Sequence, residues 1–441
     1  MRSTSLTSLA LCGMVALLGY APASAAVEGP IIGNVEGAEF RPFPIAVPDF
    51  RTPPNADPEL TRDAITLSQV LRNDLELSGV FQVLPPRSFI DTAGVVLAQV
   101  KWEDWLNVGA DGLVKALARP SETGLVVELH GYEVAAQREG LSRTLSGTRS
   151  ELRQLGHQIA DEVYRYYTQE PGIFQTRIAA VKKVGGEKHI VLLDVDGQNL
   201  TQLTSGGGLN LLPSWSPDGR SLLFTSYRYD NPDLFEIAAT GGQTKRLSNR
   251  PGLNTGGRIS PDGGRIALTL SQDGNSEVYL LDRQGGLLQR LTNAWGIDTS
   301  PSWSPDGRRL AFVSSRAGSP QVYVMDANGD NQARLTFQGN YNQTPVYSPR
   351  GNLLAFTARD ERNRFDIFVM HLDTGQISRL TQDQGNNEDP TFAPNGRLIA
   401  FTSTRTGSRE LWITNLDGTH QRQLSNGGDH SNPDWGPFTR R

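Results

Sequence analysis

A motif that recurs at a nearly constant spacing constrains this chain more than any other feature of its sequence. PSWSPDG ends at Gly219 and again at Gly307, and its relatives are GRISPDG, PVYSPRG, PTFAPNG and, near the C-terminus, PDWGP. The third residue of each copy follows the previous one by 44, 44, 44, 45 and 43 residues: Trp215, Ile259, Trp303, Tyr347, Phe392 and Trp435. Such a period indicates an array of similar supersecondary units.

Each unit has the composition of a small antiparallel sheet. Short apolar runs such as RLAFVS, QVYVMD and ARLT alternate with turns made of Gly, Asn and Asp. Units of about 40–50 residues with four short strands are typical of the blades of a β-propeller. Helical and leucine-rich repeats are excluded, because the period differs and helical periodicity is absent.

The number of blades is obtained by counting two marks of the unit. Six copies of the opening motif and six closing Leu-Thr or Leu-Ser pairs occur, but the first unit lacks an opening motif and the last motif has nothing after it. We therefore predict six blades within residues 173–441, with a C-terminal strand near Asn432–Trp435 completing the first blade. This closure removes the free sheet edges.

The Ser-Pro-Asp-Gly turn raises the question of a catalytic aspartate. Pro sets the backbone angle at the start of a turn, Asp bonds amides ahead of it, and Gly supplies positive φ. A catalytic interpretation would need equivalent sites at Asp218, Asp262 and Asp306, whereas Arg350 and Asn395 occupy the same position in other copies. We favour a structural role for the aspartates, with the preceding aromatic residue packed between blades.

The first 26 residues have the pattern of a secretory signal peptide. Arg2 precedes an apolar run from Leu9 to Leu18, and a small-residue stretch, APASAA, comes after it. The only cysteine, Cys12, lies within this predicted signal peptide, so we expect a mature chain held together without disulfides. The expected destination is the periplasm, and residues 27–40 are expected to be a mobile N-terminal segment.

Residues 41–170 do not share the repeat and read as a separate small α/β domain. FPIAVPDF and VFQVL are predicted strands, and two amphipathic helices are predicted from ELTRDAITLSQVLRNDLELSG and SELRQLGHQIADEVYRYYTQ. Three further strands are predicted between these helices. Glu170-Pro171-Gly172 ends the second helix and is the candidate domain boundary.

Several function classes lack support in the sequence. The formal net charge is −5 and basic runs are absent, so nucleic-acid binding has no electrostatic basis. His157 and Asp161 are four residues apart on a helix, but a metal would need more ligands, and we favour a histidine bonded to a neighbour. No G-x-S-x-G nucleophile motif is present. We predict no enzyme activity, no cofactor and no metal.

A polar position three residues before each recurring proline, or its equivalent, looks functional. Its members are Asn210, Asn254, Asp298, Asn342, Asn387 and His430. Because equivalent loops of six blades meet around one mouth of the central channel, we expect a ring of polar side chains there with variable neighbours. The alternative is that these residues cap their own turns.

The chain resembles the TolB family, periplasmic propeller proteins of the Tol-Pal system in Gram-negative bacteria. The segment LGHQIADEVYRYYTQEPGIFQTRIAAV, at the junction of the helix and the first blade, carries most of the resemblance, and RPFPIAVPDF is similar to the family's first strand. The resemblance covers essentially the whole mature chain. It implies a non-catalytic, monomeric interaction protein that supports outer-membrane integrity and constriction during division.

The resemblance also implies two protein partners. Pal, the peptidoglycan-associated lipoprotein, would bind the propeller mouth, and TolA would bind the extreme N-terminus; other outer-membrane proteins or lipoproteins could bind as well, keeping the protein peripheral to that membrane. The implied Pal rim is Asn210, Leu253, Asn254, Thr255, Gly256, Asp298, Thr299, Ser300, Asn342, Gln343, Asn387, Glu388, His430 and Ser431. The implied TolA segment includes Val27, Glu28, Pro30, Ile31, Ile32 and Val35. The competing hypothesis is a propeller that binds or processes a small molecule or peptide in its channel.

Overall fold

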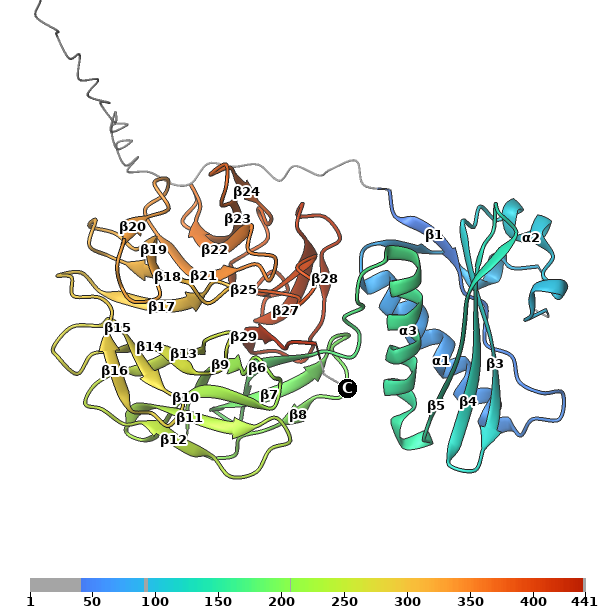
Figure 1. Ribbon diagram of the computed structural model, residues 1–441, viewed down its shortest axis with the longest axis horizontal. Coiled ribbons are helices and arrows are strands. Elements are labelled where there is room, and N and C mark those ends of the chain that lie inside the picture. The colour runs from blue at the N-terminus through green and yellow to red at the C-terminus, as the bar shows by residue number, and fades with distance from the viewer. Residues whose placement is uncertain (1–40, 91–93, 207, 439–441) are drawn as a thin grey trace, which may run out of the picture.

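The protein consists of an α/β domain followed by a six-bladed β-propeller (Figure 1). The computed structural model describes residues 41–90, 94–206 and 208–438. The predicted signal peptide and the predicted TolA segment, residues 1–26 and 27–40, lie outside the described residues. Both the fold class and the number of four-stranded blades predicted from the repeat are confirmed.

The N-terminal domain is built on one five-stranded sheet with the strand order β2-β1-β3-β4-β5. Strand β1 pairs in parallel with β2 and β3, whereas β3, β4 and β5 form an antiparallel meander. The strands are β1 (Phe43–Ala46), β2 (Phe81–Val83), β3 (Gly112–Ser121), β4 (Gly124–Glu133) and β5 (Arg138–Gly147). The helices are α1 (Pro58–Leu77), α2 (Trp102–Asn107) and α3 (Leu152–Thr168).

Helices α1 and α3 pack together and lie between the sheet and the propeller (Figure 1). Helix α1 begins where the Asp57 carboxylate accepts a hydrogen bond from the Leu60 amide at 2.7 Å, with Pro58 in the first turn. Helix α3 ends at Thr168, and the next residue, Gln169, has a φ of 59°, which breaks the helical path before Pro171. Their apolar faces enter one continuous core that also includes propeller residues such as Ile413.

Each propeller blade is a four-stranded antiparallel sheet, and in blades 2–6 the strands come one after another along the chain. Blade 1 is β29-β6-β7-β8: β29 (His430–Trp435), β6 (Arg177–Val184), β7 (Glu187–Asp194) and β8 (Thr201–Gln202). Blade 2 is β9 (Asn210–Trp215), β10 (Ser221–Tyr229), β11 (Asn231–Ala238) and β12 (Lys245–Ser248). Blade 3 is β13 (Asn254–Ile259), β14 (Arg265–Leu270), β15 (Glu277–Asp282) and β16 (Leu287–Arg290).

The remaining blades repeat this arrangement. Blade 4 is β17 (Asp298–Trp303), β18 (Arg309–Ser314), β19 (Gln321–Asp326) and β20 (Ala333–Arg334). Blade 5 is β21 (Asn342–Tyr347), β22 (Leu353–Arg359), β23 (Phe365–His371) and β24 (Ile377–Arg379). Blade 6 is β25 (Asn387–Phe392), β26 (Leu398–Ser403), β27 (Glu410–Asn415) and β28 (Arg422–Gln423).

The C-terminal strand closes the ring in the way that the offset of the repeat predicted. Strand β29 pairs with β6, so the last strand of the chain is the innermost strand of the first blade. Asp434 on β29 accepts a hydrogen bond from the Trp215 amide of blade 2 at 2.8 Å and also pairs with Arg258 of blade 3. One carboxylate therefore joins three consecutive blades.

The recurring tryptophans pack between blades, as predicted. Trp215 lies in a core cluster with side chains of blade 1, and its ring nitrogen donates to the Asp434 carbonyl at 3.1 Å. Trp303 of blade 4 likewise donates to the Arg258 carbonyl of blade 3 at 3.0 Å. In the turn after Trp303, Asp306 accepts bonds from the Ser304 hydroxyl and the Arg308 amide, which confirms its structural role.

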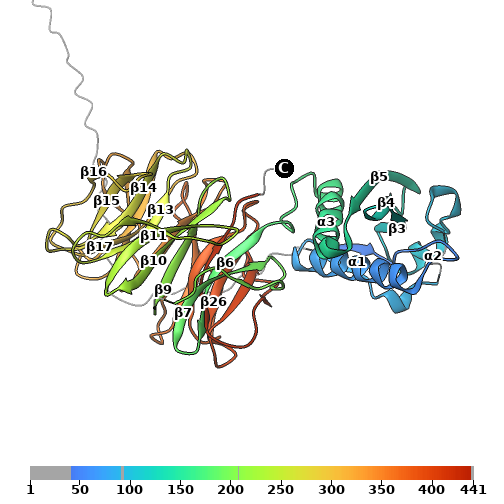
Figure 2. The ribbon, with the colours of Figure 1, turned by 90° about the horizontal axis from the view of Figure 1, so that it is seen from below.

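The two domains meet through turns of blades 1, 5 and 6. Glu170, between α3 and β6, accepts hydrogen bonds from Arg350 at 3.0 Å and from Arg397 at 2.8 Å. These arginine bonds lower the pKa of the Glu170 carboxyl, the Arg397 bond most strongly. Figure 2 shows the domains side by side, joined by the connector that leads from α3 into β6. Within the described ranges, no helix has both the length and the apolar character needed to cross a membrane.

Deleting residues 430–441 tests the closure. Removing β29 exposes the inner edge of β6 and removes the Asp434 contacts to blades 2 and 3, so we expect the propeller to lose its cooperative unfolding transition. Circular dichroism during thermal unfolding would measure this. A chain shortened only by residues 439–441 retains β29 and is the control; an unchanged transition in the longer deletion would contradict the closure.

Candidate functional site: the mouth of the propeller channel

The inner strands of all six blades share a local distortion near their beginning. Each starts at one of the six predicted ring residues, and its pairing with the next strand shifts register two residues later. At this bulge the third residue of every inner strand has positive φ: Leu212 (53°), Gly256 (66°), Ser300 (53°), Thr344 (49°), Asp389 (58°) and Asn432 (49°). Five of the six are not glycine, so the mouth is surrounded by backbone in a sparsely populated conformation.

The prediction that the six polar ring side chains line an accessible rim is wrong. The structure buries all of them completely: Asn210, Asn254, Asp298, Asn342, Asn387 and His430. A completely buried side chain cannot contact a docked partner, and these groups instead make internal hydrogen bonds. The capping alternative, raised for the same residues, describes Asn210, Asn254 and Asn342, which bond backbone of their own loops.

The bonds of the ring residues hold the mouth loops and link neighbouring blades. Asn254 accepts from the Arg250 amide at 2.9 Å and returns a bond to the Arg250 carbonyl at 2.7 Å, which fixes its own loop. Asn342 donates to Gln321 of the preceding blade at 2.7 Å, and Asn387 donates to Asp366 at 2.9 Å. His430 is bonded to Glu410 at 3.0 Å in the same way.

The other predicted rim residues differ in exposure. Leu253 is 36% exposed, and Thr255, Thr299, Gln343 and Glu388 are half-buried, whereas Ser431 is buried. Gly256 and Ser300 line a pocket in the channel itself. The structure therefore brings some of the predicted neighbours to the mouth, although the ring residues themselves point inward.

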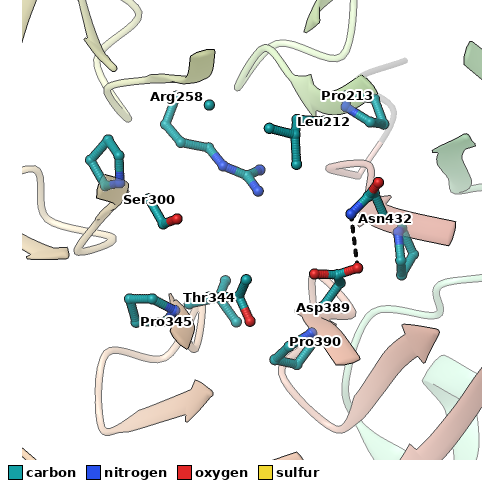
Figure 3. Close-up of a pocket in the computed structure, with 13 residues that line it drawn as sticks. Leu212, Pro213, Arg258, Ser300, Thr344, Pro345, Asp389, Pro390 and Asn432 are labelled. Atoms are coloured by element: carbon teal, nitrogen blue, oxygen red, sulfur yellow. Dashed lines mark hydrogen bonds between the residues drawn. The ribbon is translucent and has the colours of Figure 1, made fainter. Parts of the chain in front are cut away.

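The channel pocket is lined by the positive-φ residues and by the prolines next to them in sequence (Figure 3). Five prolines form part of its wall: Pro213, Pro301, Pro345, Pro390 and Pro433. The sequence alone did not single out Leu212, Thr344, Asp389, Asn432 and Arg258 as pocket residues. The available signal was the X-Pro dipeptide that recurs with the period of the blades, which marks a turn without showing that the turn lines a channel.

The polar groups of the pocket lie on different sides of the channel. Arg258 extends into it from blade 3, while Asp389 and Asn432 face it from blades 6 and 1 and are hydrogen-bonded to each other at 2.8 Å (Figure 3). Burial, reinforced by the charge of Glu388, raises the pKa of Asp389 to about 6. The pocket therefore offers a cationic donor and a carboxyl group that takes up a proton close to neutral pH, set among apolar proline rings.

Exposed apolar side chains occur in the loops that lead into the inner strands of blades 2 to 5. Leu209, Leu253 and Ile297 each precede a ring residue, and Trp295 and Phe337 lie in the same entry loops. Trp295 is 77% exposed and Ile297 is 54% exposed. We call Leu209, Leu253, Trp295, Ile297 and Phe337 the apolar arc. An exposed group of large apolar residues beside a pocket is characteristic of a surface that binds another protein.

His157 and Asp161 of α3 bond separate partners, and His157 is bonded to a neighbouring side chain, as the sequence predicted. His157 is hydrogen-bonded to Asp74 of α1 at 2.6 Å, and Asp161 accepts from the Phe174 amide at 2.9 Å and from Gln175 at 2.7 Å. Asp74, His157 and Asp196 do bring potential ligand atoms within 4.8 Å of one another. Asp196 already pairs with Arg153, however, so a guanidinium supplies positive charge at this set.

Replacing Asp389 by Asn tests its environment. Because the folded-state pKa of Asp389 is raised to about 6, ionisation destabilises the folded protein, and wild-type stability should rise as pH falls through about 6 toward 4. The variant lacks this contribution, so its stability relative to wild type should be highest above about pH 7 and should decline at about pH 5. Urea midpoints at both pH values measure the difference.

Asp306→Asn is the matched control for this measurement. Bonds from Ser304 and from the Arg308 amide lower the pKa of Asp306, so its contribution is lost only below the ordinary carboxyl range. Its effect on the midpoint should therefore be the same at about pH 5 and about pH 7. An Asp389→Asn effect that is equally independent of pH would contradict the assigned environment.

Gly256→Ala tests the backbone conformation at the mouth. The φ of 66° disfavours any residue with a Cβ, and a Cβ at this position meets no atom within 4 Å. We therefore expect a loss of about 1–2 kcal/mol in the free energy of unfolding from conformation alone, measured by urea denaturation. Gly256→Asn should cost less, because Asn tolerates this region; equal costs would point to a steric cause instead.

Comparison with known proteins agrees with this architecture. The family model described as the TolB beta propeller domain matches residues 164–439, and the TolB amino-terminal domain model matches residues 34–140. The Tol-Pal system protein TolB of Anaeromyxobacter dehalogenans (strain 2CP-1 / ATCC BAA-258) is 46% identical over 230 residues, which is 52% of this chain and 51% of that protein. The Myxococcus xanthus (strain DK1622) protein of the same name is 42% identical over 221 residues, 50% of each chain.

The chain spans about half the length of the curated relatives it matches, but a solved structure extends the similarity. The crystal structure of TolB from Acinetobacter baumannii covers 93% of this chain and 98% of its own, with a TM-score of 0.79 and 27% identity. The propeller model alone matches more than half of the chain. The two-domain architecture of this chain and its matches to both family models show that the chain belongs to the TolB family.

Proposed function

We propose that this protein is a non-catalytic, periplasmic binding protein of the Tol-Pal system that captures Pal at the mouth of its propeller channel. The relatives it resembles over the matched half of the chain are named for that system. The observation that carries the proposal is the apolar arc beside a channel pocket with a few polar groups. Protein interfaces combine apolar anchors with hydrogen-bonding groups in this manner.

The chemistry of the mouth supports a protein ligand over a metabolite. Trp295 and Ile297 project from entry loops, outside the pocket, so a ligand confined to the channel would leave them exposed to water. A protein loop that enters the channel could bury the apolar arc while it bonds Arg258 or Asp389. A small molecule or peptide held in the channel, the alternative ligand, would contact Arg258 or Asp389 but not the apolar arc.

The proposal includes TolA as a second partner, bound through residues 27–40. This assignment rests on the family resemblance and on the position of the segment before β1, which begins at Phe43. Together the two contacts would connect Pal at the outer membrane with TolA, in support of outer-membrane integrity and constriction during division. Loss of TolA capture, with Pal capture retained, on deleting residues 27–40 would distinguish the two contacts.

Ile297→Glu tests the Pal surface. Placing a carboxylate in the centre of the apolar arc would require burying a charge without a partner, so we expect Pal affinity to fall by at least about tenfold, roughly 1.4 kcal/mol or more. Surface plasmon resonance with purified Pal measures this. The folded state should be unaffected, because Ile297 is 54% exposed.

Leu288→Glu is the matched control. Leu288 is 55% exposed, like Ile297, but lies on the outer strand β16 away from the entry loops. It should bind Pal with wild-type affinity. Wild-type affinity in both variants would show that the apolar arc is not part of the interface. An equal loss of affinity in both would indicate a general effect of added charge.

A further inference from the structure

The imidazole of His157 lies at the junction of the two domains. It projects from α3, and its Nδ1 is hydrogen-bonded at 2.6 Å to Asp74 on α1. Its Nε2 faces the other way, toward the turn that begins at the end of β7 in blade 1, and lies 3.9 Å from the Asp194 carboxylate. One ring therefore stands between a carboxylate of the N-terminal domain and a carboxylate of the propeller.

This arrangement is almost sealed from solvent and is incompletely bonded. Asp74 is completely buried and His157 is 3% exposed. His157 Nε2 and Asp74 Oδ1 are buried atoms with no hydrogen-bond partner. Buried polar atoms without partners are rare in folded proteins and ask for an explanation. At 3.9 Å, Nε2 and the Asp194 carboxylate are separated by about 1 Å more than a charge-assisted hydrogen bond requires.

We propose that His157 is a proton-operated tie between the domains: when protonated it attracts the Asp194–Asp196 turn of blade 1 and holds the propeller against α3, and when neutral it releases that turn. The inference goes beyond the proposed function and does not depend on Pal or TolA. The bistable element is the contact between α3 and the turn, where Nε2 either donates to Asp194 or does not.

The charges around the ring define the direction of the effect. Asp74 and Asp161 belong to the helices of the N-terminal domain, and Asp194, Asp196 and Arg177 belong to blade 1. Arg153 on α3 already pairs with Asp196. Four carboxylates face two arginines here, so a positive imidazolium reduces the net negative charge of the cluster, and a neutral imidazole leaves it larger.

The direction of the pKa shift agrees with this assignment. Burial lowers the pKa of His157, but the hydrogen bond and the charge of Asp74 outweigh it and leave the pKa raised. The raised pKa of His157 favours the imidazolium in the folded state, so its contribution is present at mildly acid pH and is lost as pH rises through the folded-state pKa.

Single-molecule energy transfer between the domains tests the tie. Cys12 is the only cysteine, so Cys12→Ser with Thr123→Cys and Thr374→Cys leaves one dye site on the exposed β3–β4 turn and one on an exposed turn of blade 5. In the wild-type background we expect one narrow population at about pH 6 and a broadened or second population at about pH 8.5, on either side of the histidine titration.

Two variants identify the group responsible. His157→Gln cannot become charged, so its distribution should be the same at both pH values and should resemble the wild-type distribution at high pH. Asp74→Asn removes the carboxylate that raises the pKa of His157, so the transition should move to lower pH. His130→Gln is the control, because His130 bonds Glu139 within the N-terminal sheet and should keep the full wild-type response.

Two results would overturn the proposal. One is a wild-type distribution that does not change between the two pH values. The other is a full wild-type response in His157→Gln. If that variant fails to fold, Asp194→Asn takes its place, because Asp194 is only partly buried; a wild-type response in Asp194→Asn would then refute the tie.

Discussion

The pairing of β29 with β6 is the interaction on which the rest of the propeller depends. A six-bladed ring made of consecutive sheets would otherwise begin with a three-stranded blade and end with a single unpaired strand. Asp434, on this last strand, bonds blade 2 through the Trp215 amide and blade 3 through Arg258. The same arginine extends into the channel pocket, so closure of the ring and the chemistry of the channel share one ion pair.

The architecture could be predicted from the sequence because the repeat records it directly. The period of the motif predicted the blades, and the offset between the opening and closing marks predicted the exchanged strand. The roles of Trp303 and Asp306 were predictable from the same comparison, because turn chemistry and interblade packing are local consequences of residue type.

The site was predicted less well, for a physical reason. A polar residue at a periodic loop position is compatible both with an exposed rim and with a buried cap, and only the side-chain direction separates them. The register shift at the start of each inner strand turns Asn254 and its equivalents into the protein, and presents the third residue, such as Asp389, to the channel. A shift of one residue depends on backbone conformation, which composition does not reveal.

In the mouth loops, the residues that fix the backbone are different from the residues that are exposed for contact. A fully buried side chain begins the inner strand after each mouth loop. Asn254, for example, accepts a bond from the Arg250 amide of its own loop, and Asn342 donates to Gln321 of the preceding blade. In four of the six loops the side chain immediately before the buried one is exposed: Leu209, Leu253, Ile297 and Asp429. Residues at the tips can therefore be exchanged in the course of evolution without moving the loop, much as the contact residues of an antibody vary on a constant framework. Four such positions around one opening would let a lineage change its partner in small steps while the scaffold remains the same.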